Sequence, residues 1–172
     1  CGGWLLCGRI RRADNDASAG TVEELKRIVP QIRKRWPHVE IVVRADSGFA
    51  REEIMRWCEE NGVRYVLGLA KNSRLKEAIE EELRQAEEQY KETGRGSRVY
   101  KDFRYSTRKS WSRERRVIGK AEHLAKGANP RFVVTNVPME EMGAQELYEE
   151  EYCARGDMEN RIKEQQLFLF AD

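Results

Sequence analysis

Residues 39–49 read V-E-I-V-V-R-A-D-S-G-F, a short apolar run that ends in an acidic turn. Its β-branched residues are too few for a helix and predict a short, buried strand. Asp46 follows that run, and Ser47-Gly48 favours a turn before a helical pattern begins at residue 50. The segment therefore predicts a carboxylate at the carboxyl end of a central strand, the edge at which open α/β sheets bind ligands. A plain helix-capping role for Asp46 is the alternative.

The flanking segments alternate between strand and helix patterns. Residues 4–11 read as a strand, and apolar residues at helical spacing predict a helix over 21–35, opened by a T-V-E-E capping box. A second helix is expected over 50–61 and a second buried strand over 63–69. Strands that alternate with helices in this order are typical of a parallel α/β layer.

The second half of the chain is more charged and richer in strands. The patterns predict a long surface helix over 72–92, strands over 99–105, 115–119 and 131–137, and a terminal helix over 144–169.

Composition limits the classes of function. Charged residues make up 36% of the 172, but the net charge is only +2, so the distribution of charge matters more than its sum. The sequence contains no apolar run of the ~18 residues that a membrane span needs. Four widely spaced cysteines without a C-x-x-C pair, and two histidines, argue against a zinc site and favour reduced thiols in a cytosolic protein.

The terminal helix carries an unusual polar face. On a helix, Tyr152, Arg155, Glu159, Ile162 and Gln166 lie close to one another, because residues three, four and seven apart share a face. This face indicates either a site around Glu159 or an ordinary surface ion pair between Arg155 and Glu159, worth a few tenths of a kcal/mol.

A basic segment precedes that helix. Residues 95–120 hold ten Lys or Arg and two acidic residues, with tyrosine, phenylalanine and tryptophan interleaved. Positive charge beside aromatic rings suits phosphate contacts and base stacking. A charged but unspecialised hairpin is the alternative.

These motifs together resemble a known family. R-A-D-S-G-F at 44–49, W-C-E-E-N-G-V-R-Y-V-L-G-L at 57–69 and Y-x-x-R-x-x-x-E-N-R-I-K at 152–163 are similar to DDE-type insertion-sequence transposases, in particular the bacterial group with a Tyr-Arg-Glu-Lys signature. D-A-S-A-G at 16–20 and W-S-R-E-R-R-V-I-G-K-A-E-H-L at 111–124 extend the likeness over the chain.

The resemblance implies a fold class and a division of the chain. We expect an α/β, ribonuclease-H-like mixed sheet flanked by helices, with a β-rich insertion between the second Asp and the Glu. Residues 1–92 would be the catalytic core without its first strand or strands, 93–138 the basic insertion, and 139–172 the rest of the core with the Glu helix.

The resemblance also implies the site. Asp46 would be the second Asp of the acidic triad and Glu159 its Glu, together binding Mg²⁺, with two ions in the complete site and Mn²⁺ as a substitute. The reaction would be metal-dependent cleavage and strand transfer of DNA at insertion-sequence ends. The expected DNA-contacting residues are Tyr152, Arg155, Lys163, Arg108, Lys109, Trp111, Arg113, Arg115 and Arg116.

Two departures qualify the likeness. The signature Lys would fall at Gln166, with Lys163 one turn earlier, and the first Asp of the triad would lie upstream of this sequence, since Asp14 and Asp16 are poorly placed. We therefore expect a fragment that is inactive alone. The expected partners are terminal-repeat and target DNA and a second copy in the DNA complex, without a membrane, in the bacterial cytoplasm at the nucleoid. The alternatives are a non-catalytic DNA-binding remnant and a ribonuclease-H-like nuclease.

Overall fold

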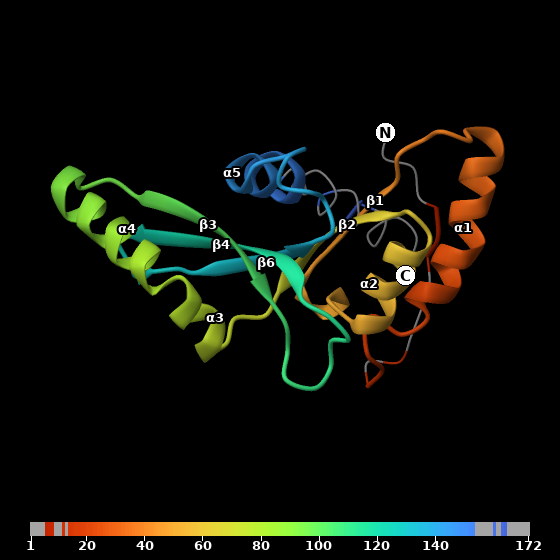
Figure 1. The fold of residues 1–172 in the computed structure, drawn as a ribbon, viewed down its shortest axis with the longest axis horizontal. Helices are drawn as coiled ribbons and strands as arrows, with labels where there is room; N and C mark the ends of the chain where they lie inside the picture. Colours follow the sequence, from red (N-terminus) through yellow and green to blue (C-terminus); the bar gives the residue numbers. More distant parts are fainter. Residues whose placement is uncertain (1–5, 9–11, 13, 154–159, 161–162, 165–172) are drawn as a thin grey trace.

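The computed structural model describes residues 6–8, 12, 14–153, 160 and 163–164. Over these residues the protein is an α/β fold with a mixed sheet flanked by helices, consistent with the ribonuclease-H-like fold of DDE transposases (Figure 1). The elements in chain order are α1 (Thr21–Arg35), β1 (Val42–Ala45), the short helix η1 (Ser47–Phe49), α2 (Glu52–Glu60), β2 (Arg64–Leu69), α3 (Ser73–Ala78), α4 (Glu80–Thr93), β3 (Ser97–Tyr105), β4 (Arg115–Leu124), β5 (Gly127–Ala128), β6 (Arg131–Thr135), α5 (Ala144–Glu146) and the π-helix η2 (Leu147–Tyr152).

The described strands form one six-stranded sheet in the order β1-β2-β6-β4-β3, with β5 beside β4. β1 and β2 are parallel, with Ala45 opposite Leu67, and β6, β4 and β3 continue the sheet in antiparallel fashion. The strands of the expected insertion thus share a sheet with those of the expected core. The three-part division of the chain remains a prediction about segments.

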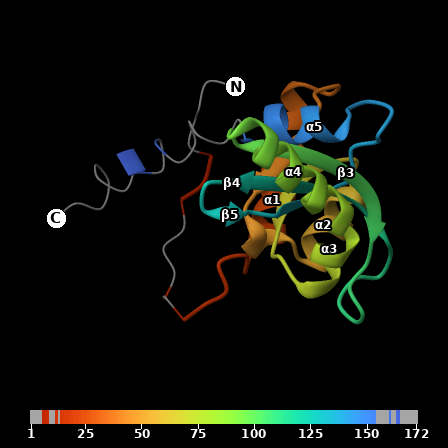
Figure 2. The same cartoon turned by 90° about the vertical axis from the view of Figure 1, so that its left-hand side faces the viewer.

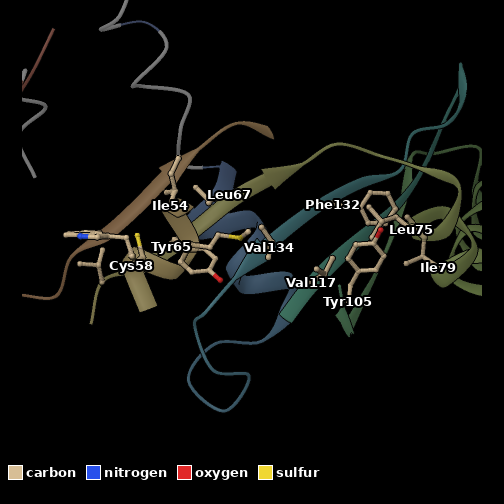
Figure 3. Close-up of a cluster of buried hydrophobic side chains, with 14 of the residues drawn as sticks. Ile54, Cys58, Tyr65, Leu67, Leu75, Ile79, Tyr105, Val117, Phe132 and Val134 are labelled. Carbon is tan, nitrogen blue, oxygen red and sulfur yellow. The ribbon is translucent and has the colours of Figure 1, made fainter. Parts of the chain in front are cut away.

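Helices cover both faces of the sheet. Figures 1 and 2 show α3 on one side of the strands and α5 on the other. Successive residues of β4 face opposite ways, so Val117 joins the larger core with α2, α3 and α4, while Ile118 packs against Leu147 and Tyr148. The larger core follows the sheet from Cys58 and Tyr65 to Leu75 and Ile79 (Figure 3).

Helix α1 spans the predicted residues but is capped differently. Its N-cap is Gly20 in the left-handed conformation (φ 76°), without a side-chain cap, so the predicted capping box of Thr21 and Glu24 is wrong. Thr21 is already helical, and Glu24 binds Arg27 instead.

The first strand is shorter and more exposed than predicted. β1 covers Val42–Ala45 and none of its four residues is buried, so the prediction of a buried strand is wrong; among the described strands it pairs with β2 alone. Val42 is 37% exposed, whereas Val43 and Ala45 pack against the core. The predicted strand over 4–11 falls mostly outside the described residues.

The predicted helix over 72–92 is two helices that meet at Ile79. Ile79 has a non-helical backbone (φ −119°, ψ 24°) and a fully buried side chain. That side chain occupies space above Gly119, where a Cβ would lie 2.6 Å from it. The break therefore follows from packing against β4, which helical periodicity does not register.

Candidate active site

Asp46 directly follows β1 and caps η1. Its Oδ1 accepts a 2.8 Å hydrogen bond from the Gly48 backbone N–H, an arrangement that the polar turn residues favour. Its other carboxylate oxygen has no hydrogen-bond or ion-pair partner among the described residues, and the side chain is exposed. Asp46 thus caps a helix and still presents an oxygen to solvent.

A cavity of about 520 Å³ opens at this edge of the sheet. Three parts of the chain form it: the Asp46 turn, the adjoining ends of β2 and β6, and the tyrosines of η2. Its lining residues are Asp46, Ser47, Gly68, Leu69, Ala70, Lys71, Pro130, Arg131, Phe132, Tyr148 and Tyr152.

Tyr152 reaches the Asp46 turn across Gly68. A Cβ on Gly68 would lie 2.6 Å from the Tyr152 hydroxyl oxygen and 3.0 Å from the Ser47 nitrogen, so only glycine leaves room for both. The Tyr148 ring packs against the Tyr152 ring, tilted by 52° with centroids 5.4 Å apart. Burial raises the pKa of Tyr148, so its hydroxyl stays protonated. The structure therefore brings the first signature residue, Tyr152, against the turn that carries Asp46.

A sequence model of the family described as "Transposase DDE domain group 1" matches residues 1–172. The chain belongs to the DDE transposases. No curated protein matches it. Membership makes the transposase a DNA-acting protein of a nucleic-acid-cleaving class, and such enzymes generally use divalent metal ions. No helix in the described part of the transposase is long and apolar enough to cross a membrane.

The donor chemistry of the cavity fits a divalent metal. Asp46 offers a carboxylate oxygen, the kind of ligand that Mg²⁺ takes. The described residues contain no group of three His, Cys, Asp or Glu side chains that could hold a metal. A second carboxylate is therefore needed, and Glu159, the predicted one, lies outside the described residues, as does Arg155.

The expected DNA-contacting arginines of β4 are structural in the transposase. Arg115, with a side chain 2% exposed, binds Glu52 and Glu59 at 2.7 Å each. Arg116, 6% exposed, binds Asp102 and donates to the Val137 carbonyl at 2.8 Å. Buried guanidinium groups that already have carboxylate partners are poorly available to phosphates, so DNA contact by these two stays a prediction that their burial argues against.

The remaining predicted contacts differ in exposure. Arg108 and Lys109 are exposed in the β3–β4 connection, without ion-pair partners among the described residues, and Lys163 is exposed and helical. Arg113 is 58% exposed and lies 3.5 Å from Glu59. Trp111 is partly buried, with its ring edge-on to Tyr105 and 5.5 Å from the Arg115 guanidinium carbon, a packing that suits a core role.

Sequence reasoning missed several residues of the cavity. Lys71 and Arg131 flank it as exposed cations, and Tyr148 forms part of its wall. For Gly68 a signal existed, because a glycine inside a strand often marks the close approach of another group. No such signal marks Lys71 or Arg131, since each is a single basic residue at the end of a strand.

Proposed function

We propose that this transposase cleaves and joins DNA strands at insertion-sequence ends, with Asp46 and Glu159 as its metal-binding carboxylates. One observation carries the proposal: Asp46 lies in an open cavity whose opposite wall is Tyr152, the first residue of the Tyr-x-x-Arg-x-x-x-Glu signature. Two segments more than a hundred positions apart thus meet at one edge of the sheet.

The position of Tyr152 supports a role for Glu159. Glu159 follows seven residues later, and on a continued helix this separation keeps the same face at a rise of about 10 Å. A helix that continued through Glu159 would therefore bring the Glu159 carboxylate to the same side as Tyr152. We propose that Arg155, on the same face, contacts DNA beside the carboxylates.

The chain's own groups hold and orient the reactants. A bound divalent ion supplies charge stabilisation at the phosphate under attack. The Gly48 N–H fixes one oxygen of Asp46, which leaves the other for the metal. The nucleophile is water when the strand is cut and a DNA 3′-hydroxyl when it is joined.

The β3–β4 connection, residues 106–114, is the proposed DNA-binding loop. Its exposed cations Arg108, Lys109 and Arg113 can reach phosphates, whereas Ser112 donates through its backbone N–H to Glu52 of α2. A loop tied down in this way presents its charges at little entropic cost. We propose Lys163 as a further contact, and a homodimer on the two DNA ends.

The test is a pair of substitutions in the intact transposase. Asp46→Asn and Glu159→Gln should each abolish Mg²⁺- or Mn²⁺-dependent cleavage of terminal-repeat DNA while leaving DNA binding nearly unchanged. The control is Asp14→Asn, which removes an exposed carboxylate that pairs, among the described residues, with Arg12 at 3.4 Å; this variant should cleave normally.

Retained cleavage in either site variant would overturn the assignment. DNA binding without metal-dependent nicking by the unaltered protein would favour a DNA-binding remnant. Cleavage without joining to target DNA would favour a nuclease.

A further inference from the structure

We propose that Lys71 and Arg131 form a phosphate-binding pair, which holds the DNA strand by the backbone next to the phosphate at Asp46. The inference rests on the proposed function, because it takes the ligand of the cavity to be DNA. It adds two binding residues that neither the signature nor the basic segment includes.

The sheet places both cations at the same edge as Asp46. Leu69, near the end of β2, pairs with Phe132, near the start of β6, so Lys71 and Arg131 lie just beyond this pair. β1 runs parallel to β2 with Ala45 opposite Leu67, which brings Asp46 to the same edge. Lys71, Arg131 and Asp46 accordingly line one cavity.

Neither cation is neutralised by the described part of the protein. Both are exposed, and neither has an ion pair or a side-chain hydrogen bond with a described residue. Two other cations of the same sheet do have partners: Lys101 binds Glu82, and Lys120 binds Glu122, each at 3.0 Å. The positive charge at the cavity is therefore left for a ligand.

A neighbouring cation lies beside Arg131 but already has an anionic partner. Arg131 lies directly opposite Lys120 in the β6–β4 ladder, and residues opposite each other in antiparallel strands point to the same face. Lys120 forms an ion pair with Glu122 at 3.0 Å, so its charge is already compensated. Of these two opposed cations, Arg131 is the one without an ion-pair partner among the described residues, and its charge is the one that a phosphate can compensate.

The rest of the cavity suits a nucleotide. Tyr148 and Tyr152 line the cavity together with the two cations and Asp46, whereas the ring of Phe132, another lining residue, packs into the larger core. Its volume of about 520 Å³ is within the range of small-ligand sites, roughly 300–1,000 Å³. Cations at the rim with aromatic walls match the way proteins hold a single strand, by phosphate contacts and stacking.

The experiment measures salt dependence of DNA binding by the intact transposase. Each phosphate contact contributes about 0.9 to the slope of log K against log salt for a duplex and about 0.7 for a single strand. Lys71→Gln with Arg131→Gln should lower the slope by about 1.4–1.8 and raise the KM for terminal-repeat DNA, with kcat changed much less. Lys71→Arg with Arg131→Lys, which keeps both charges, should keep most of the slope.

A matched control removes the same charge elsewhere. Arg84 and Lys91 are exposed on α4 and paired with glutamates, so Arg84→Gln with Lys91→Gln should leave the slope unchanged. An unchanged slope in the Lys71/Arg131 variant, or an equal loss in the control, would overturn the inference. Retained cleavage by Asp46→Asn would instead overturn the proposed function, and a lowered slope would still stand as evidence for the pair.

Discussion

At the scale of single residues, Gly68 decides how closely the walls of the active site approach. Three groups lie around the position of its absent Cβ: the Tyr152 hydroxyl at 2.6 Å, the Ser47 nitrogen at 3.0 Å and the Asp46 carbonyl carbon at 3.2 Å. Any larger residue must displace the tyrosine or the turn. Gly68 therefore couples the position of Tyr152 to that of Asp46.

Gly68→Ala should destabilise the transposase by about 1–3 kcal/mol, the usual cost of overpacking, and should slow cleavage. Tyr152→Phe removes the nearest atom, so the double variant should recover part of the stability lost. Urea unfolding of the four proteins in a double-mutant cycle measures this coupling. Purely additive effects would show that the hydroxyl is not the obstruction.

At the scale of elements, a buried charge cluster joins α2 to the start of β4. Arg115 lies between Glu52 and Glu59, and Tyr65 donates a 2.8 Å hydrogen bond to Glu59. Trp111 packs beside the same guanidinium. The cluster holds the β3–β4 connection against α2, and it accounts for the burial of an arginine that the charge pattern assigned to DNA.

Arg115→Met should cost about 3 kcal/mol or more, because two partly buried carboxylates lose their cation. Arg113→Ala is the control: its arginine is 58% exposed and should contribute under about 1 kcal/mol. Denaturant midpoints of both variants test this difference. Equal midpoints would contradict a structural role for Arg115.

Substitutions of Arg113 and Arg115 should also differ in their effect on the salt dependence of DNA binding. Arg113→Ala should lower the salt slope of binding, whereas Arg115→Met, measured where it is folded, should leave that slope unchanged.

At the scale of the whole molecule, ion clusters lie on both faces of the sheet. Glu52 and Arg115 occupy the face of the larger core. On the other face Glu122, with a side chain 5% exposed, binds Lys120 and Arg98. The stability of the packing on both faces thus depends on carboxylates that remain ionised.

These clusters predict how stability depends on pH. Burial acts to raise the pKa of Glu52, but hydrogen bonds from Arg115 and Ser112 outweigh it and lower the pKa below 4.5. Glu122 behaves likewise: burial acts to raise its pKa, but hydrogen bonds from Lys120, Arg98 and Asn129 outweigh this effect, so the pKa is lowered overall. A depressed pKa contributes stability that is present above the unfolded-state value and is lost as the pH falls through the folded-state value.

The melting temperature should therefore change little above about pH 5 and fall steeply below about pH 4.5. Glu52→Gln and Glu122→Gln should each lower the melting temperature above about pH 5 and make its fall at acid pH less steep, as thermal melts between about pH 3 and 7 would show. If the melting temperature of both variants fell as steeply at acid pH as that of the parent, the effect would belong to other carboxylates.

Local patterns predicted much of this fold, and they failed where distant residues decide. The spacing of Leu25, Ile28 and Ile32 predicts α1 to its last residue, because an amphipathic face is a property of neighbouring positions. The break at Ile79 was missed, since it depends on the room that Gly119 leaves forty residues later. The placement of Asp46 in an open turn after a strand was predicted correctly for the same local reason as α1.

The sequence by itself determined the family, the α/β class and the acidic turn at Asp46, because each depends on short motifs that follow one another in a fixed order along the chain. Only the tertiary structure decided which basic residues are buried against carboxylates and which are exposed. Arg115 and Arg116 carry the same charge as Lys71 and Arg131, but the first two are buried against carboxylates and the last two are exposed at a cavity. The physical reason is that an ion pair depends on partners brought together across the sheet, such as Glu52 and Arg115, which composition and spacing do not specify.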